Sequence, residues 1–276
     1  MEIAAPRPIE AVSAGYGPAF HKRWNWWVIL GMCVVLAVLL VLVQTVTFVA
    51  LLYIKFPTIM AAASHGDPGP LKELTASPRF LPQIFTPRGF LFIQLPTTLL
   101  MAGATILLAR AWLGASLQDL GFGKAPAAQT ILFGLGAGIV LFLISVLVGA
   151  AQDKLFGAHP QQIELIIRQH RGILAFTLDF FSAAILAPLW EETFFRGVFF
   201  TALVQRMPFW PAAILSGLAF GLGHMDRWNF LPLSILGVGL AYVYYRTGNI
   251  WANMVTHATI NATDTILIYF FPALAN

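Results

Sequence analysis

The sequence predicts an all-α membrane protein, a polytopic bundle of seven or eight transmembrane helices with one or two interfacial amphipathic helices. Of its 276 residues, 58% are hydrophobic and 10% are charged, and its mean hydropathy is +0.77. A soluble domain carries about 25% charged residues, so this chain has too few to cover a surface that faces water. Its apolar residues also form long runs, and about 20 mainly apolar residues suffice for a helix to cross a bilayer.

Seven apolar runs reach or approach that length. The first follows a polar N-terminal segment and is much longer than the roughly 7–15 apolar residues of a signal peptide. It is therefore expected to be a retained, tilted helix. The fifth and sixth runs are short and could be tilted, re-entrant or partly buried in protein. The predicted spans are 26–54, 89–109, 127–150, 173–200, 209–225, 230–245 and 249–271.

The connectors between the runs differ in character. Residues 64–90 are rich in Pro, Gly and charge, which predicts a loop with one short surface helix. Residues 116–124 form a polar connector. In 151–173, apolar residues alternate with polar ones at helical spacing, which favours an amphipathic interfacial helix. Lysines and arginines are divided almost equally between the two sides of the predicted bundle, so the positive-inside rule gives no orientation.

The charge and cysteine content exclude two classes of function. The net charge is +4, but the basic residues are scattered singly and form no basic stripe, so nucleic acid is not expected as a partner. Cys33 is the single cysteine and lies inside an apolar run. A disulfide framework and a cysteine-based metal site are therefore both excluded.

Ionisable side chains inside the predicted spans are few, and the first three spans carry none. Such residues are rare at membrane depth and are functional candidates by default. We therefore divide the chain into a polar N-terminal segment (1–25), a transmembrane scaffold (26–168) and a core that carries the candidate site (169–272). Asp179 is interpreted as structural, and Asp264 as a residue that could support the site. The full set is Asp179, Glu191, Glu192, Arg196, His224, His257 and Asp264.

Two carboxylates and a guanidinium interrupt the fourth predicted span in the stretch WEETFFR. Glu192 and Arg196 are four residues apart, so they share a helix face and can form an ion pair. Glu191 is rotated by about 100° from Glu192 and does not share that pairing. A carboxylate without such a partner suits a general base, so Glu191 is the candidate base.

Two histidines on later spans complete the candidate site. His224 follows Phe220 by about one helical turn on the fifth span, where Gly217 and Gly221 would let another helix approach closely. On the seventh span, His257 is followed four residues later by an asparagine, on the same helix face. That pair can polarise a carbonyl group and hold an oxyanion.

Each feature also has a purely structural explanation. Glu192 with Arg196 could be an ion pair without a catalytic role. His224 could be a hydrogen-bonded packing residue, and His257 with Asn261 could simply link two helices. The joint arrangement is harder to explain by packing alone.

The candidate residues form three motifs in order on successive helices, Glu191-Glu192-x-x-x-Arg196, Phe220-x-x-x-His224 and His257-x-x-x-Asn261. These motifs resemble those of the CPBP intramembrane proteases, the family of type II CAAX prenyl endopeptidases and bacterial Abi or bacteriocin-immunity proteins. The resemblance covers residues 170–270. One such motif is a weak indication, but three in this order are specific.

The resemblance implies a membrane endopeptidase that hydrolyses a peptide bond near the C-terminus or the membrane-adjacent part of its substrate. That substrate would be a peptide or protein, either prenylated or embedded in the bilayer. By the same resemblance, Glu191 and His224 would activate a water molecule, and His257 and Asn261 would stabilise the oxyanion. The ion pair beside Glu191 would support it. The chain would be a multi-pass membrane protein, of the plasma membrane in a prokaryote.

A metal ion is the open question of this site. Glu191, His224 and His257 could supply the three protein ligands of a catalytic zinc ion, with water as the fourth. However, the chain has no H-E-x-x-H motif, and a zinc-bound Glu191 would leave the reaction in need of another base. A mechanism that requires no cofactor makes fewer assumptions and is favoured.

Two alternatives from other classes remain at this stage. Intramembrane Glu, His and Arg residues also build ion relays in transporters and proton-coupled channels, although the chain shows no inverted repeat of the kind found in transporters. A non-catalytic immunity or scaffold protein could keep the same fold. The motifs of rhomboid, presenilin-like and site-2 proteases are absent from the sequence.

Overall fold

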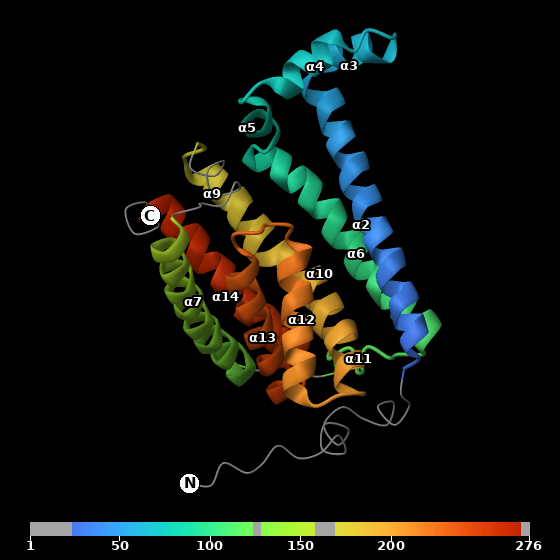
Figure 1. Cartoon of the computed structure of the whole chain (residues 1–276), viewed down its shortest axis with the longest axis vertical. Coiled ribbons are helices and arrows are strands. Elements are labelled where there is room, and N and C mark those ends of the chain that lie inside the picture. The colour runs from blue at the N-terminus through green and yellow to red at the C-terminus, as the bar shows by residue number, and fades with distance from the viewer. Residues whose placement is uncertain (1–23, 124–127, 158–168, 272–276) are drawn as a thin grey trace.

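The computed structural model describes residues 24–123, 128–157 and 169–271, and within these ranges it contains helices and no strands (Figure 1). The prediction of an all-helical chain is therefore confirmed for the described residues. The helices are α2 (Trp26–Lys55), α3 (Pro57–Ser64), α4 (Gly69–Ala76), α5 (Phe80–Ile84), α6 (Pro87–Leu113), α7 (Ala128–Phe156), α9 (Ile173–Phe180), η2 (Phe181–Leu186), α10 (Ala187–Glu192), η3 (Thr193–Phe200), α11 (Thr201–Val204), α12 (Phe209–Gly223), α13 (Phe230–Thr247) and α14 (Ile250–Phe270).

Four helices are long and apolar enough to cross a membrane: α2, α6, α7 and the continuous helix Ile173–Val204, which runs from α9 to α11. The other three predicted spans correspond to α12, α13 and α14. α12 has 15 residues, and the other two are less apolar. The described residues thus establish a multi-span helical protein, while the number of seven or eight spans remains a prediction.

The connectors are more helical than the sequence predicts. Residues 64–90 were expected to form a loop with one short helix, but they include α4, α5 and the start of α6. The physical reason is the position of the prolines, because α3, α4 and α6 each have Pro in the first or second helical position, where its missing N–H has no cost. Of the predicted interfacial helix 151–173, residues 151–156 belong to α7 and 169–172 are not helical, while residues 158–168 lie outside the described residues.

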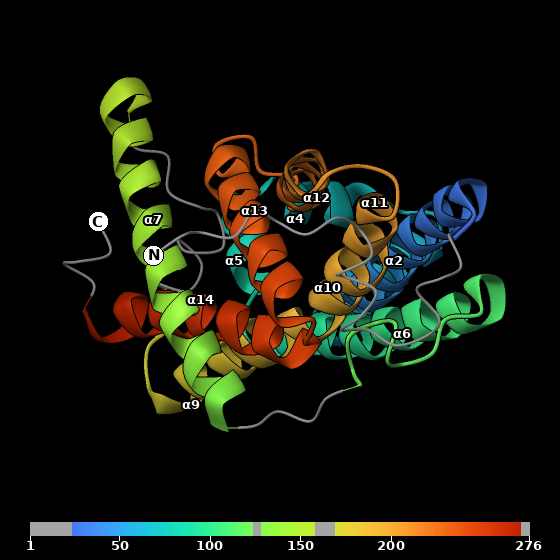
Figure 2. The same ribbon diagram turned by 90° about the horizontal axis from the view of Figure 1, so that it is seen from below.

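The helices form two groups around the central helix Ile173–Val204. α2 packs along α6 on one side, while α7 packs on α14 and α13 on the other, and α12 packs on α13 (Figures 1 and 2). α12 and α13 approach closely through their glycines, because a Cβ atom on Gly217 would lie 2.5 Å from the Ser234 carbonyl oxygen. This confirms the close helix approach predicted from Gly217 and Gly221.

The outward faces of α2 and α7 are apolar. Leu132 and Leu147 on α7 are 67% and 70% exposed, and the exposed residues of α2 include many valines and leucines. A contiguous apolar surface of this kind suits contact with lipid rather than water.

The helix Ile173–Val204 changes its winding on either side of α10. In η2, the N–H of Ala187 donates to the carbonyl of Ser182, five residues earlier. Pro188 explains this change, because its ring clashes with the carbonyl four residues before it and it has no N–H to donate. Wider turns of this type occur most often at functional sites, and here they lie on both sides of Glu191 and Glu192.

Candidate active site

Glu192 is the centre of a buried hydrogen-bond network. Its side chain is fully buried, and Oε1 accepts hydrogen bonds from Arg196 Nη1 at 3.0 Å and from His257 Nδ1 at 2.8 Å. Oε2 accepts a third from Asn253 Nδ2 at 2.6 Å. The ion pair expected from the sequence is present, but Glu192 also holds a histidine from a helix 65 residues away.

Arg196 is equally enclosed. It is 0% exposed, and besides Glu192 it donates from Nη2 to the carbonyl of Gly237 at 3.1 Å. Its guanidinium carbon lies 4.6 Å from the centre of the Phe220 ring. A buried charge is tolerated only when it is paired and hydrogen-bonded in this way. Glu192 and Arg196 therefore lie behind the site and do not face its cavity.

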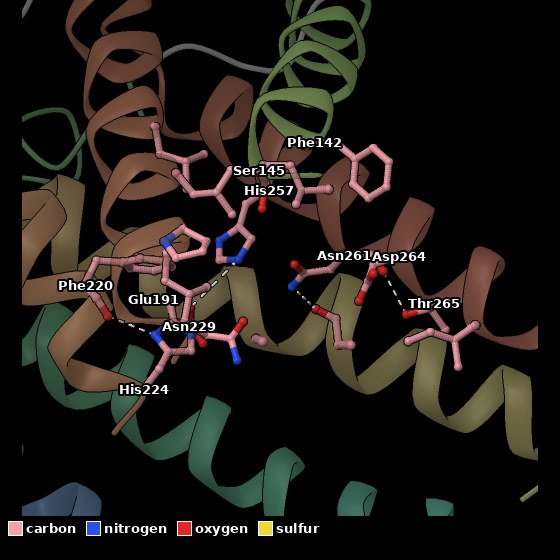
Figure 3. A pocket seen from close by; sticks show the side chains of 18 of the residues that line it. Phe142, Ser145, Glu191, Phe220, His224, Asn229, His257, Asn261, Asp264 and Thr265 are labelled. Atoms are coloured by element: carbon pink, nitrogen blue, oxygen red, sulfur yellow. Dashed lines mark hydrogen bonds and ion pairs between the residues drawn. The ribbon is translucent and has the colours of Figure 1, made fainter. Parts of the chain in front are cut away.

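The bond from Nδ1 to Glu192 fixes the orientation of the His257 ring. A carboxylate that accepts from one imidazole nitrogen sets the tautomer and aims the other nitrogen. In this structure Nε2 is the nitrogen that points towards Glu191, with 3.9 Å between His257 Nε2 and Glu191 Oε2 (Figure 3). That separation is too long for a direct hydrogen bond, but an oxygen atom placed beside both could bond to each.

Glu191 is the carboxylate that faces the cavity. It is 9% exposed, and its Oε2 has no hydrogen-bond partner among the described residues. A buried polar atom without a partner is uncommon and indicates a functional role. Glu191 is thus placed as a carboxylate that can accept a proton from a bound molecule.

A cavity of about 380 Å³ joins the predicted site residues. Glu191, His224, His257 and Asn261 all line it, although they come from three different parts of the bundle (Figure 3). Residues of α6 and α7 line it as well, so the predicted scaffold contributes to its walls. A water molecule occupies about 30 Å³, so the cavity can admit a larger molecule. Its apolar walls include Phe90, Phe142, Val146, Leu233, Leu236, Leu240, Ile260 and Ile268.

His224 lies at the C-terminal end of α12 and not inside a span, because the helix ends at Gly223. It is exposed, and its Nδ1 is 2.8 Å from the carbonyl of Phe220. A carbonyl oxygen can only accept, so Nδ1 of His224 carries a hydrogen and donates to it. The Phe220 ring lies between the two histidines, 4.7 Å from the His224 ring and 5.7 Å from the His257 ring.

The loop after His224 is held by Asp226. Its carboxylate accepts from the backbone N–H groups of Trp228 and Asn229 and from Asn229 Nδ2 at 2.9 Å. Burial raises the pKa of the Asp226 carboxyl, but these hydrogen bonds and the nearby His224 together lower it below its ordinary value. Gln152 on α7 also donates to the carbonyl of Trp228. The loop is therefore tied to the bundle beside the cavity.

Asn261 links α14 to the wide turn of the central helix. Its Nδ2 donates to the carbonyl of Ala183 at 2.8 Å. That carbonyl lacks a helical donor, because Ala187 bonds to Ser182 instead and Pro188 has no N–H. The amide has a second N–H, so this bond still leaves a donor on Asn261.

Two residues of the site were not singled out from the sequence. Asn253 is fully buried and precedes His257 by four residues, so the spacing that paired His257 with Asn261 would also have found it. Asn229 lines the cavity beside His224. No periodicity marks Asn229, because it lies in a loop.

The described residues do not present a zinc site. Within these ranges, no group of three or more His, Cys, Asp and Glu side chains is arranged to hold a metal ion. The Nδ1 atoms of His257 and His224 are bonded to Glu192 and to the Phe220 carbonyl, so only their Nε2 atoms would be available to a metal. Among the described residues, Glu191, His224 and His257 are not brought together as a metal-binding group.

Comparisons with known proteins point to the same part of the chain. Residues 173–263 match the family model described as type II CAAX prenyl endopeptidase Rce1-like. A Bacillus subtilis (strain 168) protein named "Putative membrane peptidase YdiL" is 32% identical over 95 residues, which are 34% of this chain and 39% of that relative. No solved structure matches the chain.

These matches confirm the resemblance to the CPBP proteases over the segment that carries the three motifs. Together with the four apolar helices, they establish an integral, multi-pass membrane protein.

Proposed function

We propose that this protein is an intramembrane endopeptidase in which Glu191 activates the attacking water, because residues 173–263 match the type II CAAX prenyl endopeptidase Rce1-like family model and resemble a membrane peptidase relative. The observation that carries the proposal is the unpaired Oε2 of Glu191, which lies 3.9 Å from His257 Nε2 in a cavity shared with His224 and Asn261. The substrate would be cut near its C-terminus or next to its membrane segment, as for a CAAX-type protein.

The proposed reaction begins with a proton transfer. Glu191 takes a proton from water, the water oxygen bonds to the carbonyl carbon of the substrate, and the carbonyl oxygen becomes an oxyanion. The C–N bond then breaks, and the proton passes from Glu191 to the leaving amine. The exposed His224, whose Nε2 can accept a proton, exchanges protons between this site and solvent.

The oxyanion would be held by His257 and Asn261. Since Nδ1 of His257 donates to Glu192, a hydrogen on Nε2 requires the imidazolium form. That form also balances the buried charges, because two carboxylates then face one guanidinium and one imidazolium. Preorganised donors of this type lower the barrier by several kcal/mol, about 2.7–4 for one donor.

We further propose that α12, α13 and α14 cross the bilayer, which gives seven spans. α13 and α14 have 18 and 21 residues, and at about 1.5 Å per residue their lengths are roughly 27 and 32 Å, close to the 30 Å of the hydrocarbon layer. Part of their lower hydropathy comes from buried polar residues, such as Ser234 on α13 and Asn253 and His257 on α14. In a prokaryote the membrane would be the plasma membrane.

The test is proteolysis by purified protein of membrane proteins from a host strain that lacks it, with new C-termini identified by mass spectrometry. We expect Glu191→Gln to lower turnover by about 10²–10⁴-fold, since it removes the base, while the exposed control Glu73→Gln on α4 retains it. Full turnover in Glu191→Gln would contradict the assignment of the base. Turnover that a chelator abolishes and zinc restores would favour the metal mechanism.

A further inference from the structure

The cavity has a second acidic end, away from Glu191. Asp179 and Asp264 line it together with the site residues, and Figure 3 shows Asp264 on the far side of Asn261 from His257. Asp179 is 2% exposed. Its Oδ2 accepts a hydrogen bond from the Tyr269 hydroxyl at 2.6 Å.

Asp179 has no ion-pair partner within 4.0 Å among the described residues. The nearby Arg171 donates instead to the carbonyls of Ile268 and Tyr269, at 3.2 Å each, and no salt bridge joins His170 to Asp179. A carboxylate at membrane depth is costly without a direct ion-pair partner. The Tyr269 hydroxyl solvates Asp179 but is uncharged, so a cation that enters the cavity would supply the ion pair that the described residues do not form.

The central helix Ile173–Val204 and α14 both line the cavity along its length. Asp179, Ala183, Ala187 and Glu191 all line it at intervals of four residues. In a regular α-helix each such step drifts by about 40°, so three steps would turn Asp179 well away from Glu191. The wide turns of η2 take up this drift and keep both carboxylates on one wall.

α14 runs antiparallel to this helix, and three contacts show the register. His257 meets Glu192, Asn261 meets Ala183, and Tyr269 meets Asp179. The catalytic groups therefore lie towards one end of the two helices, and the two aspartates lie towards the other, with Asp179 farther along than Asp264. Glu191 supplies an independent sign that this cavity takes a ligand, since it is nine-tenths buried and its Oε2 is unpaired.

The separation of the two ends can be expressed in substrate residues. His257 and Asp264 are seven residues apart on α14, or roughly 10 Å, and Glu191 and Asp179 are twelve apart, or at most about 18 Å. An extended peptide advances about 3.3–3.6 Å per residue. The acidic end is thus three to five substrate residues from the reacting carbonyl.

We propose that Asp179, with Asp264 beside it, binds a Lys or Arg side chain of the substrate, three to five residues from the scissile bond. This inference rests on the proposed endopeptidase function and names its substrate class. The apolar walls between the two ends, among them Phe142, Val146 and Ile260, would cover the aliphatic stem of such a side chain while its charge reaches Asp179.

The test uses purified full-length protein in detergent and quenched fluorogenic peptides that are apolar except for one lysine, placed in turn at each position from the scissile bond. The reference peptides carry norleucine at the same positions. We expect kcat/KM to be about tenfold higher for lysine than for norleucine at three to five residues on one side, since one desolvated charge pair contributes this much or more. Equal values at all positions would overturn the inference.

The variants separate charge from shape. Asp179→Asn keeps the size and the hydrogen bonding of the side chain but should remove the lysine preference, and Asp179→Glu should keep most of it. The matched control Glu73→Gln removes an exposed carboxylate from α4 and should leave the preference unchanged. If Asp179→Asn does not fold, Asp264→Asn provides the second variant and should reduce the preference. A preference that survives both changes overturns the inference.

Binding to the Glu191→Gln variant distinguishes the two proposals. Lysine peptides should bind this variant about tenfold more tightly than norleucine peptides, and the difference should vanish in Glu191→Gln combined with Asp179→Asn. If the lysine peptides bind more tightly but the unaltered protein cleaves no peptide, the binding of a basic side chain is supported and the endopeptidase function is contradicted. If the unaltered protein cleaves the peptides but lysine and norleucine peptides bind equally, the endopeptidase function is supported and the binding of a basic side chain is overturned.

Discussion

α2 and the helix Ile173–Val204 are similar in length, with 30 and 32 residues, and both are apolar enough to span a membrane. They differ in what they bury. The buried residues of α2 are all apolar, among them Ile29, Met32 and Leu36, whereas the second helix buries Glu192 and Arg196 completely. Length and hydropathy alone do not separate a helix that anchors from a helix that carries a site.

The physical difference is the surrounding solvent. Lipid is as apolar as leucine, so an apolar helix gains only packing when it leaves lipid for protein. A polar group in hydrocarbon has no such alternative and must find its partners within the protein. The buried charges of the central helix therefore fix which helices surround it, while the contacts of α2 are more replaceable.

The largest effect is expected at Glu192. Glu192→Gln leaves Arg196 buried without its counter-charge and replaces one of the two acceptor oxygens of the carboxylate by an NH2 donor, which should destabilise the fold by about 3–5 kcal/mol. Thermal unfolding in detergent measures this loss. The double change Glu192→Gln with Arg196→Gln should cost less than the sum of the two single changes, because no unpaired guanidinium remains. Additive costs would show that the two charges are not coupled.

A smaller effect is expected on α2. Leu36→Ala should destabilise the protein by about 1–2 kcal/mol, below the 2–5 kcal/mol of water-soluble cores, because lipid also solvates the helix when it is not packed. The same unfolding measurement applies, with the outward-facing Val38→Ala as control. Activity per folded molecule should not change. A loss as large as that of Glu192→Gln would remove the distinction between the two helices.

The smallest effect is expected outside the spans, at Asp226. Because its folded-state pKa is lowered, its carboxylate stabilises the loop above the unfolded pKa of about 3.9, and this stabilisation is lost as the pH falls through the lower folded value. The amide protection factors of residues 224–229, which are corrected for the intrinsic exchange rate, should therefore stay constant between pH 7 and 5 and fall only in more acidic solution. Asp226→Asn should remove this acid dependence. Protection factors that already fall at pH 6 in the unaltered protein would contradict the assignment to Asp226.

The parts of the site that the sequence predicts are those that depend on spacing within one helix. Helical periodicity predicts three such features. They are the pairing of Glu192 with Arg196, the close helix approach at Gly217 and Gly221, and the orientation of Glu191 away from the Glu192–Arg196 pair. Asn253 follows from the same rule, but its side chain is uncharged, so it is not among the ionisable residues that mark the site in the sequence.

The parts that the sequence does not predict depend on register between distant helices. The bond from His257 to Glu192 spans 65 positions and that from Asn261 to Ala183 spans 78, and no local pattern determines which turn meets which. Pro188 predicts an irregular helix, but it does not predict that the Ala183 carbonyl, which lacks a helical donor, accepts a hydrogen bond from Asn261. The predicted span 209–225 includes His224, whereas α12 ends at Gly223.

The winding of η2 makes the length of the chain between residues 180 and 187 as important as its composition. Removing a single residue there would rotate everything before it by about 100° relative to everything after it. Asp179 would then face a neighbouring helix or lipid, although Glu191, His224, His257 and Asn261 would all still be present. Two related proteins could thus share all three motifs and differ in what they accept, through one deletion in a stretch that contains no catalytic residue.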